Sequence, residues 1–531
     1  MKQVVQFKLN QTDQVFSTSL IQFSPSKSSQ GVFKNEVSES QHSFKSFKEL
    51  KDEFNITHHQ HSQFYDSSFN SIDIIVETEM VDEDNKTPKI ANFNKNNLMM
   101  KKQYTRMDNK QKSTNFEAFL LIGKYFFSVG ILALPYMFYL TGFILGSLLI
   151  IFTAAMTIYS IHLIMAVHLD IQSKVDPSQV KQTTTITELA FKIFGVPGQL
   201  SCRIFSTIAN LGSCISYIIF FEIYISGIIQ EQWSNKITNE QAHLIGALFA
   251  FTIILPLSTV NNITLFWQTN LVGFLVGLIA VLWMLYLDFS LILGTGGVQR
   301  SENDLWKTDN FFLAVGISVY SFQVMGIALN IRNSMENPNN FIPVFYTSTI
   351  LTCLMYLVFG IVTQLAIGEY TEDIVLLNFA PQTIIGFCVR LMYTISVLLS
   401  YPLKFYVVVQ IYENLKCFKD EIFSVEKYEM SEYKNFFDQS LALLKRYAIR
   451  YVLIVSIFML SLTTYKLAKI ISLVGSLGSI ILQFVIPQLV YMRYFKVQWY
   501  RIIFGITICL IFVISACLGV FYSLMSLSSN H

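Results

Sequence analysis

The pattern of hydrophobic and polar positions changes sharply near residue 114. From Met1 to about Thr114 the chain is polar and shows no sustained periodicity. Beyond it, apolar blocks of about 20 uncharged residues alternate with short polar segments, and about 20 residues suffice for a helix to cross the hydrocarbon core of a bilayer. The pattern predicts about eleven membrane-spanning helices. They are expected at 115–139, 142–167, 203–229, 242–260, 266–293, 311–330, 342–367, 380–412, 448–467, 469–491 and 499–526.

The polar segment, residues 1–114, is rich in Ser, Gln, Asn, Lys and Asp, as in "SPSKSSQ" and "NFNKNN". Such a segment buries too little apolar surface to offset the entropy of ordering, so we expect a disordered cytoplasmic tail. Within it, the run "HHQH" (His58, His59, His61) could bind a metal ion. No framework of Cys or carboxylates surrounds the run, so a solvated polar stretch is favoured and no metal site is predicted.

Composition agrees with a membrane protein: 52% of the 531 residues are hydrophobic and only 14% are charged. The formal net charge of +2 gives no indication of a nucleic-acid partner. The predicted spans hold no His/Asp/Glu cluster that could serve as catalytic machinery, and no G-x-x-x-x-G-K-[ST] loop is present. We therefore expect an all-α, multi-pass protein of residues 115–526 in a lipid bilayer, which is not an enzyme and has no cofactor.

Lysine and arginine are distributed unevenly between the two sets of loops. With the tail in the cytosol, about twenty of these residues fall on the cytosolic side and about five on the other. The five are Lys236, Arg300, Lys307, Lys466 and Lys469. This bias predicts a cytosolic N-terminus and an external or luminal C-terminus.

The first span contains a helix-breaking stretch, "SVGILALP". Gly130 allows close backbone approach, and Pro135 removes a helical hydrogen bond. Broken helices at membrane depth persist where the freed backbone lines a cavity or meets a ligand. An unwound segment from Ser128 to Ile131 would offer N–H groups at the positive end of a half-helix to a carboxylate. The alternative is a Pro-kinked helix packed through a small residue.

The sixth span favours the broken-helix interpretation. Its centre, in "NFFLAVGISVYSFQVMGIALNIRNSMENP", is rich in Gly and polar residues. Spans one and six open two blocks of five spans, 115–293 and 311–491. An odd number of spans makes the blocks antiparallel, and interrupted helices at matching places indicate a midplane substrate site in a secondary transporter.

Four segments in the same order resemble the amino acid/auxin permease family. "GKYFFSVGILALPYMF" is similar to that family's Lys-Gly-Asn-Ile-Gly-Thr-Gly-x-x-x-Leu-Pro opening, with Lys124, Gly130, Leu134 and Pro135 matching. The sixth span with "NIRNSMENPNNF", "YTISVLLSYPLKFYVVVQI" and "KIISLVGSLGSIILQFVIPQL" resemble its spans six, eight and ten. The resemblance covers the whole membrane region and is closest to the vacuolar, proton-coupled branch. It implies a LeuT-type five-plus-five inverted repeat with one extra C-terminal helix, and transport of neutral amino acids with protons or sodium.

The chain departs from the family where coupling ions are concerned. Phe126 stands where the family has an Asn, and Ser128 where it has the following Gly, so a side-chain ligand for sodium is lost. Gln323 replaces a Glu of the family, and Leu121 replaces a His of its proton-coupled branch. Glu222 is the best remaining carboxylate for a proton relay, because ionisable groups within spans are usually functional. The alternative is that Glu222 reaches water at the outer surface.

The predicted site residues lie in spans one, three, six and eight. Tyr217 lies on the face of span three that carries Asn210, Ser213 and Ser216. Ser400 occupies the family's hydroxyl position opposite span one, and Ser396 is one turn away. The predicted substrate-binding residues are Ser128, Val129, Gly130, Ile131, Tyr217, Ser318, Tyr320, Ser321, Phe322 and Gln323, and the predicted coupling or gating residues are Glu222, Lys124, Ser396 and Ser400.

The sequence thus predicts a secondary transporter of amino acids that works by alternating access and is proton-coupled. Sodium-coupled transport and a non-transporting amino acid sensor on the same fold remain alternatives. A vacuolar or lysosomal membrane and the plasma membrane both remain open.

Overall fold

The computed structural model divides the chain into two units, residues 1–111 and 112–531, which are described separately. It describes residues 3–8, 21–23, 75–80, 112–174, 185–233, 237–259, 263–295, 305–379, 384–413, 450–462, 466–495 and 498–528. The "HHQH" run (His58, His59, His61) lies outside the described residues.

In the first unit the structure describes three short strands: β1 (Gln3–Lys8), β2 (Ile21–Phe23) and β3 (Ile75–Met80). They form an antiparallel sheet in the order β2-β1-β3. Val, Ile and Phe in these segments favour strands. The rest of the polar segment lies outside the described residues, so its expected disorder stays a prediction.

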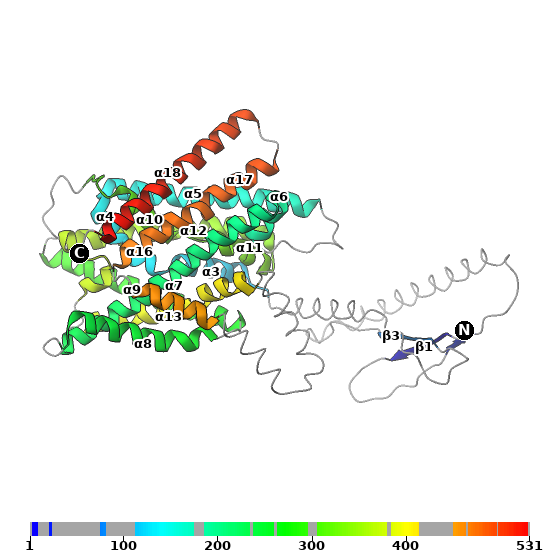
Figure 1. The fold of residues 1–531 in the computed structure, drawn as a ribbon, viewed down its shortest axis with the longest axis horizontal. Helices are drawn as coiled ribbons and strands as arrows, with labels where there is room; N and C mark the ends of the chain where they lie inside the picture. The colour runs from blue at the N-terminus through cyan, green and yellow to red at the C-terminus, as the bar shows by residue number, and fades with distance from the viewer. Residues whose placement is uncertain are drawn as a thin grey trace, which may run out of the picture. The chain divides into compact units, whose positions relative to one another are not determined.

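The described part of the second unit is helical, and Figure 1 shows its helices side by side as a bundle. The helices of its first half are α3 (Asn115–Phe126), η1 (Val129–Ala133), α4 (Leu134–Thr141), α5 (Phe143–Ser173), α6 (Ile186–Phe194), α7 (Val196–Trp233), α8 (Asn239–Thr259) and α9 (Ile263–Thr295). Next come α10 (Phe311–Ser321), α11 (Met325–Ser334), η3 (Pro338–Asn340), α12 (Phe341–Ile367), η4 (Gly368–Tyr370), η5 (Val375–Asn378) and α13 (Ile384–Glu413). The last are a helix at Arg450–Ser461, α16 (Leu467–Val474), η6 (Gly475–Ser479), η7 (Ile481–Val485), α17 (Ile486–Tyr494) and α18 (Trp499–Ser528).

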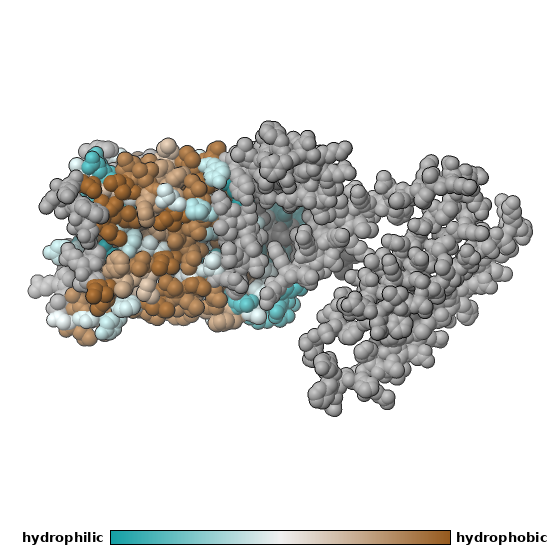
Figure 2. Space-filling model, turned by 90° about the horizontal axis from the view of Figure 1, so that it is seen from below, coloured by the Kyte–Doolittle hydropathy of each residue, from teal (hydrophilic) through white to brown (hydrophobic). Residues whose placement is uncertain are grey.

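The outer surface of the bundle is apolar. Figure 2 shows hydrophobic residues over the visible face of the helical unit, with hydrophilic residues toward its ends. Among the described residues, nine helices are long and apolar enough to cross a membrane, and up to ten if the bent pair α3 and η1–α4 is one span. The predicted ninth span contains the shorter apolar helix Arg450–Ser461. The expectation of an all-α membrane protein is therefore confirmed, while the exact number of spans stays a prediction.

The first span is broken between Phe126 and Val129, where the predicted unwound stretch begins. Helix α3 starts in a capping box of Thr114 and Glu117 and ends at Phe126. Ser128 is extended, with φ −113° and ψ −172°, and the 3₁₀ helix η1 follows. The two halves meet at an angle of 46°. Pro135 lies in the first turn of α4, where its missing N–H costs no helical hydrogen bond.

The sixth span is interrupted in a similar way. Helix α10 ends at Ser321, and α11 begins at Met325. Between them Phe322 and Val324 have non-helical backbone angles, with φ −100° at Phe322 and φ −142° at Val324.

Helix α10 lies against the start of the tenth span almost backbone to backbone. A Cβ atom on Gly475 would collide with the carbonyl oxygen of Gly316, and one on Gly316 would collide with Ser472. Ser472 also donates a hydrogen bond to the carbonyl of Leu313 at 2.8 Å. Small residues permit such close contact between membrane helices, and the contact holds the first half of the sixth span in place.

Candidate functional site

Tyrosine hydroxyl groups bind the backbone freed by the first break. Tyr393 of α13 donates to the carbonyl of Ser128 at 2.9 Å. Tyr356 of α12 donates to the carbonyl of Phe126 at 2.6 Å and to that of Ser321 at 3.1 Å. Because Phe126 and Ser321 are the last helical residues before the two breaks, the hydroxyl of Tyr356 joins both broken helices.

The two breaks also touch through predicted substrate-binding residues. A Cβ atom on Gly130 would lie 2.8 Å from Ser321 Oγ and 2.9 Å from Tyr320 Cδ1. Val129 and Ile131 are fully buried on either side of Gly130. The backbone at Gly130 therefore lies so close to Ser321 and Tyr320 that any side chain at this position would disturb the contact.

A glutamine from the tenth span binds the second break. Gln483, in the π-helical segment η7, accepts a hydrogen bond from the backbone N–H of Val324 at 3.3 Å and donates to Thr157 of α5 at 2.7 Å. Gln323 is buried, and its Oε1 has no hydrogen-bond partner in the described structure. Phe322 is fully buried at the second break.

Other predicted residues of the sixth span face neighbouring helices. Ser318 donates to Thr153 of α5 at 2.9 Å. The hydroxyl of Tyr320 lies beside Ser213 and Ser216 of α7, two of the polar residues singled out in the third span.

A small cavity brings together predicted residues from three spans. It is lined by Leu121, Lys124, Tyr125, Tyr217, Asn270, Ser400, Leu403 and Lys404. Lys124, Tyr217 and Ser400 were expected at the site; Asn270 and Lys404 were not.

Lys124 is held inside the bundle by the predicted gating residue Ser396. Its ammonium donates to Ser396 Oγ at 2.9 Å and to the carbonyl of Ser396 at 3.2 Å, and Ser396 donates to the carbonyl of Gly273 at 2.6 Å. Ser400 donates back to the carbonyl of Ser396 at 2.8 Å. Lys124 is only 4% exposed, so its charge is bound within the protein and does not reach the membrane surface.

A second small cavity lies farther along α7 and α13. It is lined by Phe220, Ile223, Tyr224, Ile374, Leu376, Leu377 and Arg390. Arg390 donates to the carbonyl of Leu377 at 3.1 Å and ties α13 to η5. Along α13, Arg390 and Lys404 are about 21 Å apart at about 1.5 Å per residue, so the two cavities lie at different depths.

Glu222 is buried beside a histidine that sequence reasoning missed. Its Oε1 lies 3.4 Å from His243 Nδ1 of α8, and its Oε2 has no hydrogen-bond partner in the described structure. Glu222 is 1% exposed, so it does not reach water directly. A second acid, Asp288 of α9, is also buried and accepts a hydrogen bond from Thr363 at 2.6 Å.

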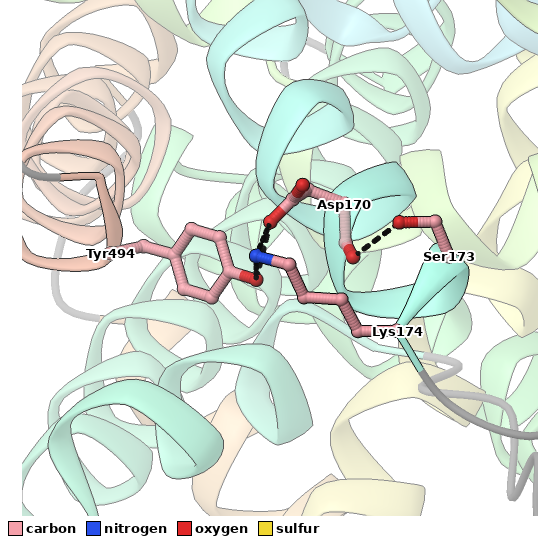
Figure 3. Close-up of polar contacts among 4 residues, drawn as sticks. All are labelled: Asp170, Ser173, Lys174 and Tyr494. Atoms are coloured by element: carbon pink, nitrogen blue, oxygen red, sulfur yellow. Dashed lines mark hydrogen bonds and ion pairs between the residues drawn. The ribbon is translucent and has the colours of Figure 1, made fainter.

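A polar cluster joins the C-terminal ends of α5 and α17. Figure 3 shows Lys174 and Tyr494 converging on Asp170. Lys174 Nζ and Tyr494 Oη each lie 2.6 Å from Asp170 Oδ2, and Ser173 donates to the Asp170 carbonyl at 2.8 Å. The hydrogen bond to Asp170 raises the pKa of Lys174, so the contact is charged at neutral pH.

Six site residues were missed by the sequence analysis: Tyr356, Tyr393, Asn270, Lys404, Gln483 and His243. Lys404 and Gln483 carried a usable signal, because each is an isolated polar residue within an apolar span. The two tyrosines carried none, since aromatic residues occur throughout the spans.

The comparisons with known proteins agree with this architecture. The family model described as "Transmembrane amino acid transporter protein" matches residues 111–528. Amino acid transporter AVT3A of Arabidopsis thaliana is 24% identical over 392 residues, which are 73% of this chain and 84% of that protein. Vacuolar amino acid transporter 4 of Saccharomyces cerevisiae is 22% identical over 399 residues, 72% of this chain and 53% of that protein. These relatives are transporters and not enzymes. With four-fifths of its length matched, the chain belongs to the transmembrane amino acid transporter family, the amino acid/auxin permeases.

Proposed function

We propose that this protein is a secondary active transporter that moves neutral amino acids across a vacuolar or lysosomal membrane together with protons. One observation carries the proposal: two broken helices meet in the centre of the bundle, and one hydroxyl group, that of Tyr356, binds both. Interrupted helices that meet at membrane depth are typical of transporter substrate sites.

The arrangement of the breaks supports a LeuT-type inverted repeat. Each five-span block, 115–293 and 311–491, opens with a broken helix, and the broken helices contact one another through Gly130 and Ser321. The two cavities lie at different depths of α13, and Tyr393, Ser396 and Val397 between Arg390 and Ser400 are buried. This geometry suits an occluded state, from which alternating access would open one side at a time.

The substrate carboxylate is assigned to the first break. Ser128 caps η1, and its side chain accepts a weak hydrogen bond from Gly130 N–H at 3.4 Å. A carboxylate would compete well for N–H groups at this helix start, because charge-assisted hydrogen bonds are stronger than neutral ones. Amino acid amides and esters are therefore expected to compete poorly with the parent acids.

Proton coupling is assigned to Glu222 with His243. The pair places a buried carboxylate 3.4 Å from a histidine, and ionisable groups within membrane spans are usually functional. The vacuolar assignment rests on the name of the yeast relative, and vacuolar and lysosomal lumens are acidic enough to supply protons.

Uptake by the purified protein in proteoliposomes tests the proposal. We expect a panel of neutral amino acids to be transported when a pH gradient is imposed and not when a sodium gradient replaces it. Flux that follows sodium alone would assign coupling to sodium. Saturable binding without flux under every gradient would identify a sensor instead of a transporter.

Glu222→Gln is expected to flatten the pH dependence of uptake. Wild-type uptake should rise as the substrate side is acidified, because the carrier must take up a proton there; the amide cannot, so its rate should vary by less than about twofold over the same range. Initial rates between pH 5 and pH 7.5 provide the measurement. Asp288→Asn, which neutralises the other buried acid, should keep the wild-type profile, and an unchanged profile in Glu222→Gln would remove Glu222 from coupling.

Tags on the two termini should report from opposite sides of the membrane. The uneven distribution of Lys and Arg places Met1 in the cytosol and His531 outside it or in the lumen. Protease protection of each tag in sealed vesicles gives the answer. Equal protection of both tags would require an even number of spans and would exclude the five-plus-five arrangement with one extra helix.

A further inference from the structure

Two buried lysines line the small cavity beside the first break. Lys124 and Lys404 both line it, and each is only 4% exposed. Lys124 is bound by Ser396, and the ammonium of Lys404 lies 3.6 Å from the ring centroid of Tyr125. The cavity therefore gathers two cationic side chains inside a membrane bundle.

No carboxylate of the described side chains neutralises these two cations. The helices that line the cavity, α3, α7, α9 and α13, carry three described carboxylates. Glu117 caps α3, Glu222 lies beside His243, and Asp288 accepts from Thr363. Burial without a counter-ion disfavours the charged form of a lysine, so an anion bound between Lys124 and Lys404 would stabilise both ammonium groups.

The cavity also has the polarity that a carboxylate needs. The ammonium groups of Lys124 and Lys404 provide charged donors, and the side chains of Asn270 and Ser400 add polar atoms to the wall. Lys124 is four residues before Ser128 in the same broken span, so the cavity lies close to the first break along the chain.

We propose that this cavity, lined by Lys124 and Lys404, binds the side-chain carboxylate of an acidic amino acid. The protein then transports glutamate and aspartate in addition to neutral amino acids. This proposal rests on the proposed function, because it assigns a second contact to the same substrate. The α-carboxylate occupies the first break, and the side-chain carboxylate lies toward the lysines.

Competition between isosteric amino acids tests the assignment. The full chain in proteoliposomes takes up a labelled neutral amino acid, and unlabelled L-glutamate and L-glutamine compete with it. We expect glutamate to inhibit wild-type uptake at a concentration at least about tenfold lower than glutamine does, because only the side chain of glutamate carries a negative charge that pairs with the lysine ammonium groups. This comparison requires no variant.

Variants of Lys404 then locate the contact. Lys404→Gln should weaken inhibition by glutamate at least about tenfold and leave that by glutamine within about threefold, whereas Lys404→Arg should retain the preference. Lys192→Gln, which neutralises an exposed cation on α6, is the matched control and should behave as wild type.

Three results would overturn the assignment while leaving amino acid transport intact. The first is that glutamine competes as well as glutamate in wild type, and the second is that a folded Lys404→Gln variant keeps the glutamate preference. The third is that uptake occurs in chloride buffer but not in gluconate buffer and does not respond to glutamate. The last would assign the cavity to an inorganic anion. If no amino acid is transported or competes, the proposed function fails together with the inference.

Discussion

Gly130→Ala is expected to lower the initial rate of amino acid uptake at least about tenfold, since overpacking a close contact costs about 1–3 kcal/mol. The added Cβ would lie 2.8 Å from Ser321 Oγ, 2.9 Å from Tyr320 Cδ1 and 3.2 Å from the Cα of Ser321. One of these atoms is backbone, so a side-chain rotation alone cannot relieve the contact. The two broken helices would be pushed apart where we place the substrate carboxylate. Gly130→Val should reduce uptake further.

Gly123→Ala is the matched control for this prediction. It makes the same change in α3, two turns before Gly130, where the nearest atom would lie at 3.4 Å and belongs to the side chain of Phe274. We expect uptake within about twofold of wild type, because this spacing is ordinary van der Waals contact. Normal uptake by Gly130→Ala and Gly130→Val would show that "SVGILALP" is only a kink and that the site lies elsewhere.

Gly475→Ala should be the most destabilising of the substitutions considered. Its Cβ would collide with the carbonyl oxygen of Gly316, so α10 and the tenth span would have to separate along their contact. We expect the free energy of unfolding to fall by at least about 2 kcal/mol, since neither backbone can move without its helix. The melting temperature of detergent-purified protein and its monodisperse yield provide the measurement.

Gly227→Ala tests whether the effect arises from the contact or from replacing a helical glycine. A Cβ on Gly227 of α7 would meet nothing within 4 Å, so this variant should be as stable as wild type or slightly more so. Equal melting temperatures for Gly475→Ala and wild type would show that α10 and η6 do not depend on their close approach.

The hydropathy pattern was sufficient to predict the membrane helices and the first break. Apolar length depends on the local sequence alone, and the unwound segment begins at Ser128, where glycine and proline indicated it. The resemblance to the transporter family could likewise be recognised from the sequence, because each of its motifs is one contiguous stretch of residues. The short helix Arg450–Ser461 shows where the pattern is weaker, since length alone does not distinguish it from a complete span.

The partners of the breaks could not be predicted from the sequence. Tyr356 lies 230 residues after Phe126, and Gln483 lies 159 residues after Val324. No feature of the local sequence marks either pair as partners. Such pairs depend on how distant helices pack, and a hydropathy pattern contains no information on rotation about the helix axis. The same limit explains why Lys404 could be recognised as unusual while its shared cavity with Lys124 could not.

The hydroxyl of Tyr356 has one hydrogen and serves two carbonyl oxygens, at 2.6 Å and 3.1 Å. It can fully satisfy only one of them at a time, so rotation of a single O–H bond shifts the hydrogen bond from one broken helix to the other. A net hydrogen bond contributes about 0.5–1.5 kcal/mol, which is close to thermal energy. Exchange of this hydrogen bond between the two carbonyls therefore changes the free energy little, so Tyr356 links the two broken helices without locking either of them in place.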